Sequence, residues 1–283
     1  MRLLPLWARV LLTVDGYARR GFRAYEVIRD ELLLGRLDPR LHGVLTERAY
    51  ANDRTAYLPG GARFQAGLFD WETTVLERMH LPPGAAILLA AAGGGRELAT
   101  LLERGYEVVA FEPNEALLEG ARAVSAEAGG KQVVRASLED LVESAMLGTG
   151  PLVGVQGPFE MVLLGWASFS HLTDVATQVG VLQAIRKLFP EAVVVASFLV
   201  RGDVATDQPR RSVRAVRRVL RALGGGRVNP ALAYLPRAGV VYRFSPNEIG
   251  QIARESGFAV RLLDTTRDGY AILEPLPVEV GST

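Results

Sequence analysis

Three consecutive glycines, Gly93 to Gly95, and a carboxylate seventeen residues beyond them, Glu112, are the residues whose spacing points most directly to chemistry. An apolar run of strand type, 87–91, leads into the glycines, a helical pattern follows, and a second apolar run, 108–111, ends at Glu112. Glycines let the main chain turn sharply and let a ligand lie against the backbone. A carboxylate at the end of the second strand can accept hydrogen bonds from both hydroxyls of a ribose. The unit therefore predicts a nucleoside-binding site.

Two common nucleotide fingerprints are missing from this unit. The dinucleotide pattern G-x-G-x-x-G, counted from Gly93, puts its third glycine on Leu98. That glycine normally allows close contact between helix and strand, so a leucine there argues against a nicotinamide-dependent oxidoreductase. The phosphate-binding run G-x-x-x-x-G-K-[ST] does not occur in the sequence.

The segment resembles motif I of the class I S-adenosylmethionine-dependent methyltransferases, a strand that ends in G-x-G-x-G. Aligned on Gly95, the three glycines of the motif fall on Ala91, Gly93 and Gly95, which the resemblance places beside S-adenosyl-L-methionine. The acidic residue that the family carries two positions before the first glycine falls on Leu89. This departure removes a group that usually helps to hold the methionine end of the cofactor.

The resemblance assigns further cofactor contacts along the chain. Glu112 would lie at the ribose, and the following Pro113 would also contact the cofactor. Ser137 would meet the adenine amino group, with Leu138 packed on the adenine ring. Gly165 opens the loop after the fourth strand, where the family places the methyl group.

The order of the predicted elements implies the fold. We expect an α/β fold with a seven-stranded Rossmann-like methyltransferase sheet and helices on both faces, over residues 81–276. Beyond the first unit, we expect strands at 131–136, 159–164 and 192–199, a helix at 245–257, and a closing hairpin of 258–265 with 269–274. The helix prediction is supported by a polar cap, a proline at the first helical position and a terminal glycine.

Three segments lie outside the shared sheet. Residues 1–80 are mostly helical in pattern and predict a cap that contacts the substrate. Residues 201–243 predict an inserted helical lid, and 277–283 a C-terminal tail. Within the cap, the first twenty residues lack a clean cleavage site and are too short to span a bilayer. We expect there an amphipathic helix that packs on the body or over the active site in a cytoplasmic protein, with peripheral membrane binding as the alternative.

Candidate catalytic residues follow from the chemistry of methyl transfer. The donor is already activated, so the protein has to align the acceptor and, where needed, remove its proton. Trp166 has the position and bulk to wall the acceptor pocket, and His171 could act as a general base at neutral pH. Tyr57 is placed near the amino-acid end of the cofactor. Each also fits a purely structural role, as a core aromatic or a structural hydrogen-bonding group.

The sequence narrows the class of methyl acceptor but does not identify the molecule. The N-methyltransferases that act on base amines carry an (N/D/S)-P-P-(Y/F) motif after the fourth strand, and Leu-Gly-Trp-Ala stands there instead. We therefore expect a small-molecule O- or N-acceptor, with a C-acceptor left open. A stripe of arginines would attract an anionic substrate, although charged stripes on helices are more often solvated faces. Its members are Arg210, Arg214, Arg217, Arg218 and Arg221, with Arg211 at its edge.

Composition excludes several other classes of protein. Lys and Arg number 32 and Asp and Glu 31, so no strongly basic surface indicates nucleic-acid binding. The chain has no Cys and 3 His, which excludes disulfides and thiolate metal sites and argues against a histidine-rich metal centre. A homodimer is among the expected partners. A non-catalytic protein that binds S-adenosylmethionine stays open as an alternative, because Leu89 and Ala91 depart from the motif.

Overall fold

The computed structural model describes residues 6–131, 133–201, 218–219, 222, 229–266 and 268–277. The helices are α1 (Leu6–Arg36), α2 (His42–Tyr57), α3 (Ala62–Gln65), α4 (Asp70–Met79), α5 (Arg96–Glu103), α6 (Glu115–Glu127), α7 (Leu138–Leu147), α8 (Val175–Leu188) and α10 (Pro246–Glu255), with 3-10 turns η1 (Pro39–Leu41) and η2 (Ser168–His171). The strands are β1 (Ala86–Ala90), β2 (Glu107–Phe111), β3 (Met161–Leu164), β4 (Val193–Val200), β5 (Leu232–Leu235), β6 (Gly239–Phe244), β7 (Phe258–Asp264) and β8 (Gly269–Pro275).

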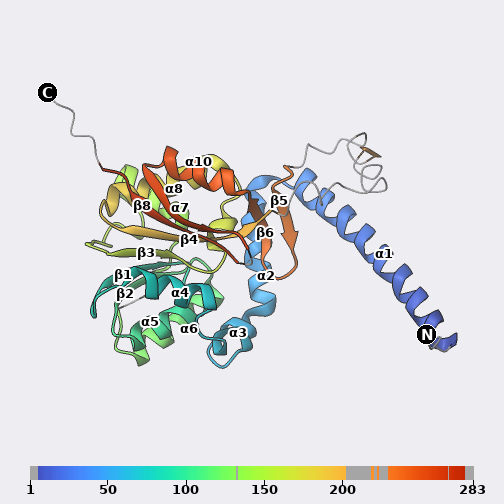
Figure 1. Ribbon diagram of the computed structural model, residues 1–283, viewed down its shortest axis with the longest axis horizontal. Helices are drawn as coiled ribbons and strands as arrows, with labels where there is room; N and C mark the ends of the chain where they lie inside the picture. The colour runs from blue at the N-terminus through green and yellow to red at the C-terminus, as the bar shows by residue number, and fades with distance from the viewer. Residues whose placement is uncertain are drawn as a thin grey trace.

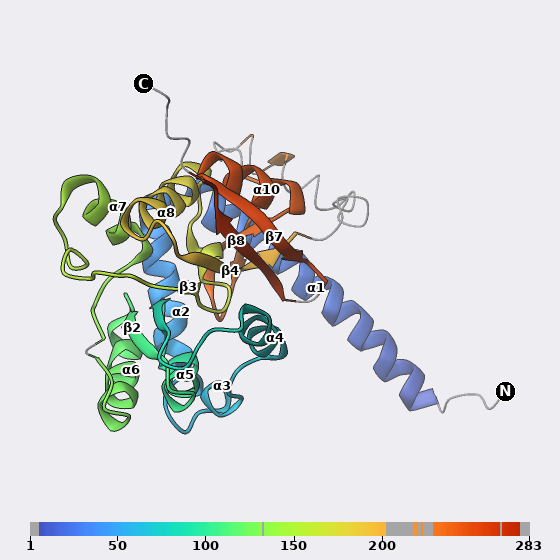
Figure 2. The same ribbon diagram turned by 60° about the vertical axis from the view of Figure 1, so that its left-hand side comes forward.

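A single twisted sheet forms the centre of the molecule. Strands β2, β1, β3 and β4 lie side by side and parallel, β8 runs antiparallel to β4, and β7 pairs with β8. Helices cover both faces, with α7, α8 and α10 on one side and α4, α5 and α6 on the other (Figures 1 and 2). Strand β1 is buried on both faces, with Ile87 to Ala90 fully buried. This explains its unbroken apolar run, because a parallel strand covered by helices on both sides has no solvated face.

The predicted α/β sheet is confirmed, with two local differences. The strand expected at 131–136 is reduced in the described residues to an isolated bridge between Phe111 and Val134. The insertion expected as a helical lid contains the hairpin of β5 and β6, and β6 pairs in parallel with the last two residues of β4. Most of the arginine stripe, Arg210, Arg211, Arg214, Arg217 and Arg221, lies outside the described residues.

Helix ends were readable from the sequence where local hydrogen bonds decide them. In α10 the hydroxyl of Ser245 accepts from the backbone N–H of Glu248, and the carboxylate of Glu248 accepts from the backbone N–H of Ser245 at 2.7 Å. Pro246 occupies the first turn, and Gly257 follows the helix with a φ of 80°. The helix predicted at 245–257 is thus confirmed, with the reciprocal cap that its sequence indicates.

The N-terminal segment divides into two parts. Helices α2, α3 and α4 pack against the sheet domain. Helix α1 instead extends away from it, and its C-terminal end lies at β5 (Figure 1). There the guanidinium of Arg29 lies 4.9 Å from the ring centroid of Tyr234. The expectation that the first helix packs on the body or over the active site is therefore corrected: among the described residues, only its last turns reach the body. No helix in the described part of the chain is long and apolar enough to cross a membrane.

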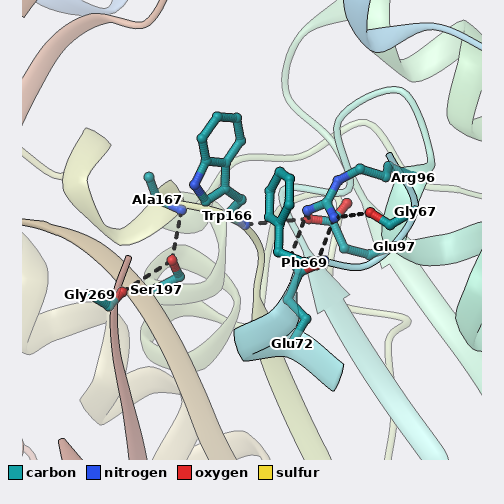
Figure 3. A network of polar contacts seen from close by, with 9 residues as sticks. All are labelled: Gly67, Phe69, Glu72, Arg96, Glu97, Trp166, Ala167, Ser197 and Gly269. Carbon is teal, nitrogen blue, oxygen red and sulfur yellow. Dashed lines mark hydrogen bonds and ion pairs between the residues drawn. The ribbon is translucent and has the colours of Figure 1, made fainter. Parts of the chain in front are cut away.

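A buried cluster of charges joins the cap to the glycine loop (Figure 3). Nη1 of Arg96 donates to the carbonyl oxygen of Gly67 and to Oε2 of Glu72, each at 2.6 Å. Nη2 of Arg96 donates to Oε1 of Glu72 and to Oε1 of Glu97, again at 2.6 Å. The three charged side chains are 8%, 2% and 7% exposed. The guanidinium of Arg96 therefore links the first turn of α4 to the first turn of α5.

The loop after β3 is held by hydrogen bonds to two neighbours, Glu97 at the start of α5 and Ser197 on β4 (Figure 3). The backbone N–H of Trp166 lies 3.4 Å from Oε1 of Glu97. The indole ring of Trp166 packs edge-on against the ring of Phe69. The next residue, Ala167, has a left-handed φ of 55°, and its N–H donates to Oγ of Ser197 on β4 at 3.0 Å. The Ser197 hydroxyl in turn donates to the carbonyl oxygen of Gly269 on β8. These bonds hold the loop at the carboxyl ends of the strands.

Replacing Arg96 by Met should strongly destabilise the protein, because Glu72 and Glu97 would remain buried without a cation. We expect a loss of about 3–5 kcal/mol in the free energy of unfolding, measured by urea denaturation. Arg261→Met is the matched control, since Arg261 pairs with Glu274 at the surface, where the two side chains are 47% and 46% exposed. The control should cost less than about 1 kcal/mol. Equal losses in the two variants would contradict a structural role for the cluster.

Candidate functional site

A cavity lies at the carboxyl ends of β1, β2 and β3. Its walls come from the loop after β1, the end of β2, the start of α7, the segment after β3, and the cap helices α2 and α3. Ligands of open α/β sheets bind at this edge, outside the carboxyl ends of the strands. The sequence-predicted residues that line it are Ala91, Gly93, Glu112, Pro113, Ser137, Leu138, Tyr57, Trp166 and His171. Gly95 and Gly165 do not line it.

The glycine loop turns through left-handed backbone. Ala91, Gly93 and Gly95 have φ values of 56°, 57° and 95°. A Cβ built on Gly93 would meet no atom within 4 Å, so this residue leaves open space on the cavity wall. Non-glycine residues pay about 1–2 kcal/mol for this conformation, which makes the alanine at 91 notable.

The neighbouring glycines are required by protein packing. A Cβ on Gly94 would stand 2.1 Å from the carbonyl oxygen of Tyr57, so the end of α2 rests directly on the loop. A Cβ on Gly95 would stand 3.1 Å from Cα of Ala121 in α6. Gly165 is similar, with its Cβ position 3.0 Å from the carbonyl oxygen of Ala91. Gly95 and Gly165 therefore shape the site from behind the cavity wall.

Glu112 is the buried carboxylate at the end of β2. It is 4% exposed, its Oε2 accepts from the N–H of Gly93 at 2.8 Å, and its Oε1 accepts from the N–H of Asn114 at 2.9 Å. Burial raises the pKa of Glu112 to about 7, against the opposing effect of these two backbone hydrogen bonds. Each oxygen keeps a second lone pair for a ligand hydroxyl.

Ser137 and Leu138 are the two residues that the sequence predicted at the adenine ring. Ser137 caps α7: its Oγ accepts from the N–H of Asp140 at 3.3 Å, and its N–H donates to the Asp140 carboxylate at 2.6 Å. Leu138 beside it is buried and lines the cavity. The Ser137 hydroxyl thus has a structural partner, while Leu138 offers the apolar surface that a ring could contact.

Aromatic rings form the wall between the cap and the loop after β3. The rings of Phe69 and Trp166 meet edge-on with centroids 5.0 Å apart. The guanidinium of Arg63 lies 5.1 Å from the Trp166 ring centroid, and that of Arg96 lies 4.0 Å from the Phe69 centroid. Trp166 therefore lines the cavity, with Arg63 over its ring and Arg96 over the neighbouring ring of Phe69. The sequence pattern indicated neither cation.

His171 is paired inside the protein. Its Nε2 atom lies 3.0 Å from the hydroxyl oxygen of Tyr50 in α2, and the two rings meet edge-on. Burial lowers the pKa of His171 to about 4, with a weaker opposing effect from the Val240 backbone. Burial also raises the pKa of Tyr50 above its usual range. The pair is therefore uncharged at neutral pH, which makes His171 a weak base.

One polar group at this end of the cavity has no hydrogen-bond partner among the described residues: Oγ of Ser168, whose residue is 5% exposed and lines the cavity. Buried polar atoms are normally satisfied by protein, water or ligand, so an unpaired one in a cavity wall indicates a polar occupant.

Strand β1 has no counterpart of the acidic residue that motif I of the methyltransferases places near the methionine end of the cofactor. Leu89 is fully buried, packed on the face of the sheet that α4, α5 and α6 cover. Charged groups elsewhere on the cavity wall include Arg63, Arg96 and Glu97. Among the described residues, no group of three or more His, Cys, Asp or Glu side chains could hold a metal ion.

Sequence reasoning missed Tyr50, Arg63 and Glu97. Tyr50 had a usable signal, because it precedes Tyr57 by seven residues and so shares its face of α2. Glu97, directly after the glycine loop, looked like an ordinary acid in the first turn of a helix. Arg63 carried no signal, since its position depends on the packing of α3 against the loop after β3.

Comparisons with known proteins agree on the fold. Neither family models nor curated proteins match the sequence. Among solved structures, a 1,6-didemethyltoxoflavin-N1-methyltransferase from Burkholderia thailandensis is 18% identical, with a TM-score of 0.55, over 85% of this chain and 91% of its own. The CcbJ methyltransferase from Streptomyces caelestis is 15% identical, with a TM-score of 0.54, over 82% and 98%.

A third similar structure is the magnesium protoporphyrin IX methyltransferase from Synechocystis PCC 6803 with bound SAH. It is 17% identical, with a TM-score of 0.51, over 83% of this chain and 96% of its own. Likeness at this level of identity concerns the fold, and function has to be argued from the site. The chain therefore has the fold of the class I S-adenosylmethionine-dependent methyltransferases.

Proposed function

We propose that this protein transfers a methyl group from S-adenosyl-L-methionine to an oxygen or nitrogen atom of a small molecule. The observation that carries the proposal is Glu112, a buried carboxylate held by two backbone N–H groups beside the open wall at Gly93. Burying such a group is costly, and the described contacts leave lone pairs on both of its oxygens. Two ribose hydroxyls would supply the missing donors.

The remaining cavity wall fits the rest of that cofactor. Leu138 and Pro113 offer apolar surface beside Glu112, as an adenine ring requires. At the opposite end, Arg63 could pair with the methionine carboxylate. Glu97, which lines the cavity and already accepts from Arg96, could accept from the ammonium group in place of the acid missing at Leu89. These contacts are our assignment from positions on the cavity wall.

The protein's part in the reaction is alignment and exclusion of water. The bound cofactor supplies a methyl group already activated on a sulfonium. Trp166, Phe69 and Tyr57 wall the cavity between cap and sheet, where an acceptor would be shielded from solvent. The unpaired hydroxyl of Ser168 and the Tyr50–His171 pair could orient an acceptor hydroxyl or amine by hydrogen bonds. Such orientation is worth several kcal/mol in displacement reactions, about 7–11 in the best cases.

The proposed acceptor is a small molecule. The small-molecule assignment is supported by the sequence, which lacks the base-amine motif, and by the aromatic walls of the cavity. A C-acceptor stays compatible with the same geometry. An anionic acceptor rests on the arginine stripe, most of which lies outside the described residues.

The proposal is tested by calorimetric titration with S-adenosylmethionine, S-adenosylhomocysteine and NAD, followed by a labelled-methyl assay on a broad acceptor panel. We expect both sulfur compounds to bind, NAD not to bind, and label to enter a small-molecule product. Tight binding without any methylated product would favour the alternative, a non-catalytic S-adenosylmethionine-binding protein. Binding of NAD alone would overturn both.

Cofactor affinity should depend on the ionisation of Glu112. Since burial raises its pKa to about 7, the carboxyl is protonated below that pH and loses an accepting lone pair. Affinity for S-adenosylhomocysteine should therefore fall about tenfold from pH 8 to pH 6, the change expected when only the ionised form binds. Glu112→Gln should weaken binding by about 1.5–3 kcal/mol and remove this pH dependence. Glu115→Gln, at an exposed position three residues on, is the control.

Substitutions at the two glycines should separate ligand contact from folding. Gly93→Ala places a methyl group in open cavity space, so it should weaken cofactor binding while costing only about 1–2 kcal/mol of stability for the left-handed backbone. Gly95→Val presses on Ala121 and should mainly lower the melting temperature. Calorimetry and thermal denaturation of both variants make the comparison. Normal affinity in Gly93→Ala would place the cofactor elsewhere.

His171 should stay neutral throughout the physiological range. Because burial lowers its pKa to about 4, its imidazole NMR signals should show no titration between pH 6 and pH 8. The signals are assigned by their loss in His171→Gln. Tyr50→Phe removes the hydrogen bond to Nε2 and should shift those signals without restoring a charge at neutral pH. A transition near pH 6.5 in the unmodified protein would return His171 to the role of general base.

A further inference from the structure

We propose that α1 is a self-association helix, which pairs antiparallel with α1 of a second copy of this chain. The helix has 31 residues and is about 46 Å long at 1.5 Å per residue. Both views show it leaving the body as a separate arm (Figures 1 and 2). This inference is independent of the proposed enzymatic function.

The arm carries large apolar side chains that the other described residues leave uncovered. Val14, Phe22 and Tyr25 are 58%, 61% and 58% exposed, and Ile28 and Leu32 are each 39% exposed. Soluble proteins rarely expose contiguous apolar surface of this kind unless another molecule covers it.

The spacing of one row of residues on α1 indicates that a second helix packs against these apolar side chains. Steps of four and three residues alternate along this row, which is the heptad seam of a two-stranded coiled coil. The seam consists of Val14, Ala18, Gly21, Tyr25, Ile28 and Leu32. All of these positions are exposed.

Small and large residues along the seam are complementary in the antiparallel sense. When Gly21 faces Tyr25 of the second copy, Ala18 faces its Ile28 and Val14 faces its Leu32. Each layer then joins a small or medium side chain to a larger one. A parallel pair would set Gly21 against itself and Tyr25 against itself, with a void in one layer and crowding in another.

Gly21 supports close contact with a second helix. Glycine is among the poorest helix formers, yet it stands in mid-helix, where a Cβ would meet nothing within 4 Å. Nothing in the part of the chain that the structure describes therefore requires a glycine there. Facing Tyr25 of a second copy, it would provide the space for that ring.

Charge favours a protein partner over a membrane surface. Helices that lie on anionic membranes carry a polar face rich in Lys and Arg. In α1, six arginines are accompanied by four acidic residues, Asp15, Glu26, Asp30 and Glu31. In the antiparallel pair Asp15 lies at the level of Arg29 of the second copy, whose guanidinium is held within its own chain by Asp30 and Tyr234. The same arrangement puts the two bodies at opposite ends of the paired arms.

The oligomeric state of the full chain tests the proposal. Sedimentation equilibrium should give twice the 30.6 kDa mass of the chain. Tyr25→Glu and Ile28→Glu, in the seam, should give monomers at the same concentration. Arg19→Glu introduces the same side chain on the solvent side of α1 and should leave the dimer intact. A monomer in the unmodified protein overturns the proposal, and binding of that monomer to anionic vesicles would identify a membrane helix instead.

Cross-linking tests the antiparallel sense. The chain has no Cys, so one introduced cysteine can only pair with its copy. Residue 24 lies near the centre of the antiparallel pair, and Ala24→Cys should cross-link through a two-carbon bis-maleimide. Residue 18 lies about 15 Å along the axis from residue 18 of the second copy, so Ala18→Cys should not. Efficient cross-linking at 18 would overturn the antiparallel arrangement.

Discussion

The site depends on one buried guanidinium. Arg96 gathers the carboxylates of Glu72 and Glu97 and the carbonyl of Gly67, so it joins the cap, the glycine loop and the segment after β3 at a single point. A charge removed from water tolerates little displacement of its partners, because each lost bond leaves an unpaired ion in a poorly solvated place. This restraint fixes Phe69 and Trp166, the aromatic wall of the cavity, relative to the sheet.

The three residues of the glycine loop have different roles: two allow helices to pack closely, and one borders the cavity. Gly94 admits the end of α2, and Gly95 admits α6, while Gly93 borders the open cavity. Glu112 connects the two functions, since its carboxylate accepts from Gly93 and faces the same space. The loop is therefore held from behind by helices and offers backbone and one carboxylate to a ligand in front.

One part of the cavity wall is polar but uncharged. Tyr50 and His171 bond to each other across 121 residues of sequence, and burial keeps both neutral. Together with the unpaired Ser168 hydroxyl, they form a hydrogen-bonding surface within aromatic walls. Such a surface orients a neutral acceptor better than it ionises one, which is consistent with chemistry whose activation resides in the methyl donor.

The sequence alone determined the parts of the site that are local. A strand, a glycine turn, a helix and a second strand ending in Glu112 bring Gly93 and Glu112 to one sheet edge, because the carboxyl ends of neighbouring parallel strands lie at the same edge. The cap of α10 could also be read from the sequence, because its hydrogen bonds join Ser245 to Glu248, only three residues away. Only the tertiary structure decided the Arg96 cluster, the Tyr50–His171 bond and the reduction of the strand at 131–136. Those depend on which surfaces remain uncovered after the sheet forms, and distant segments compete for them without leaving a pattern in neighbouring residues.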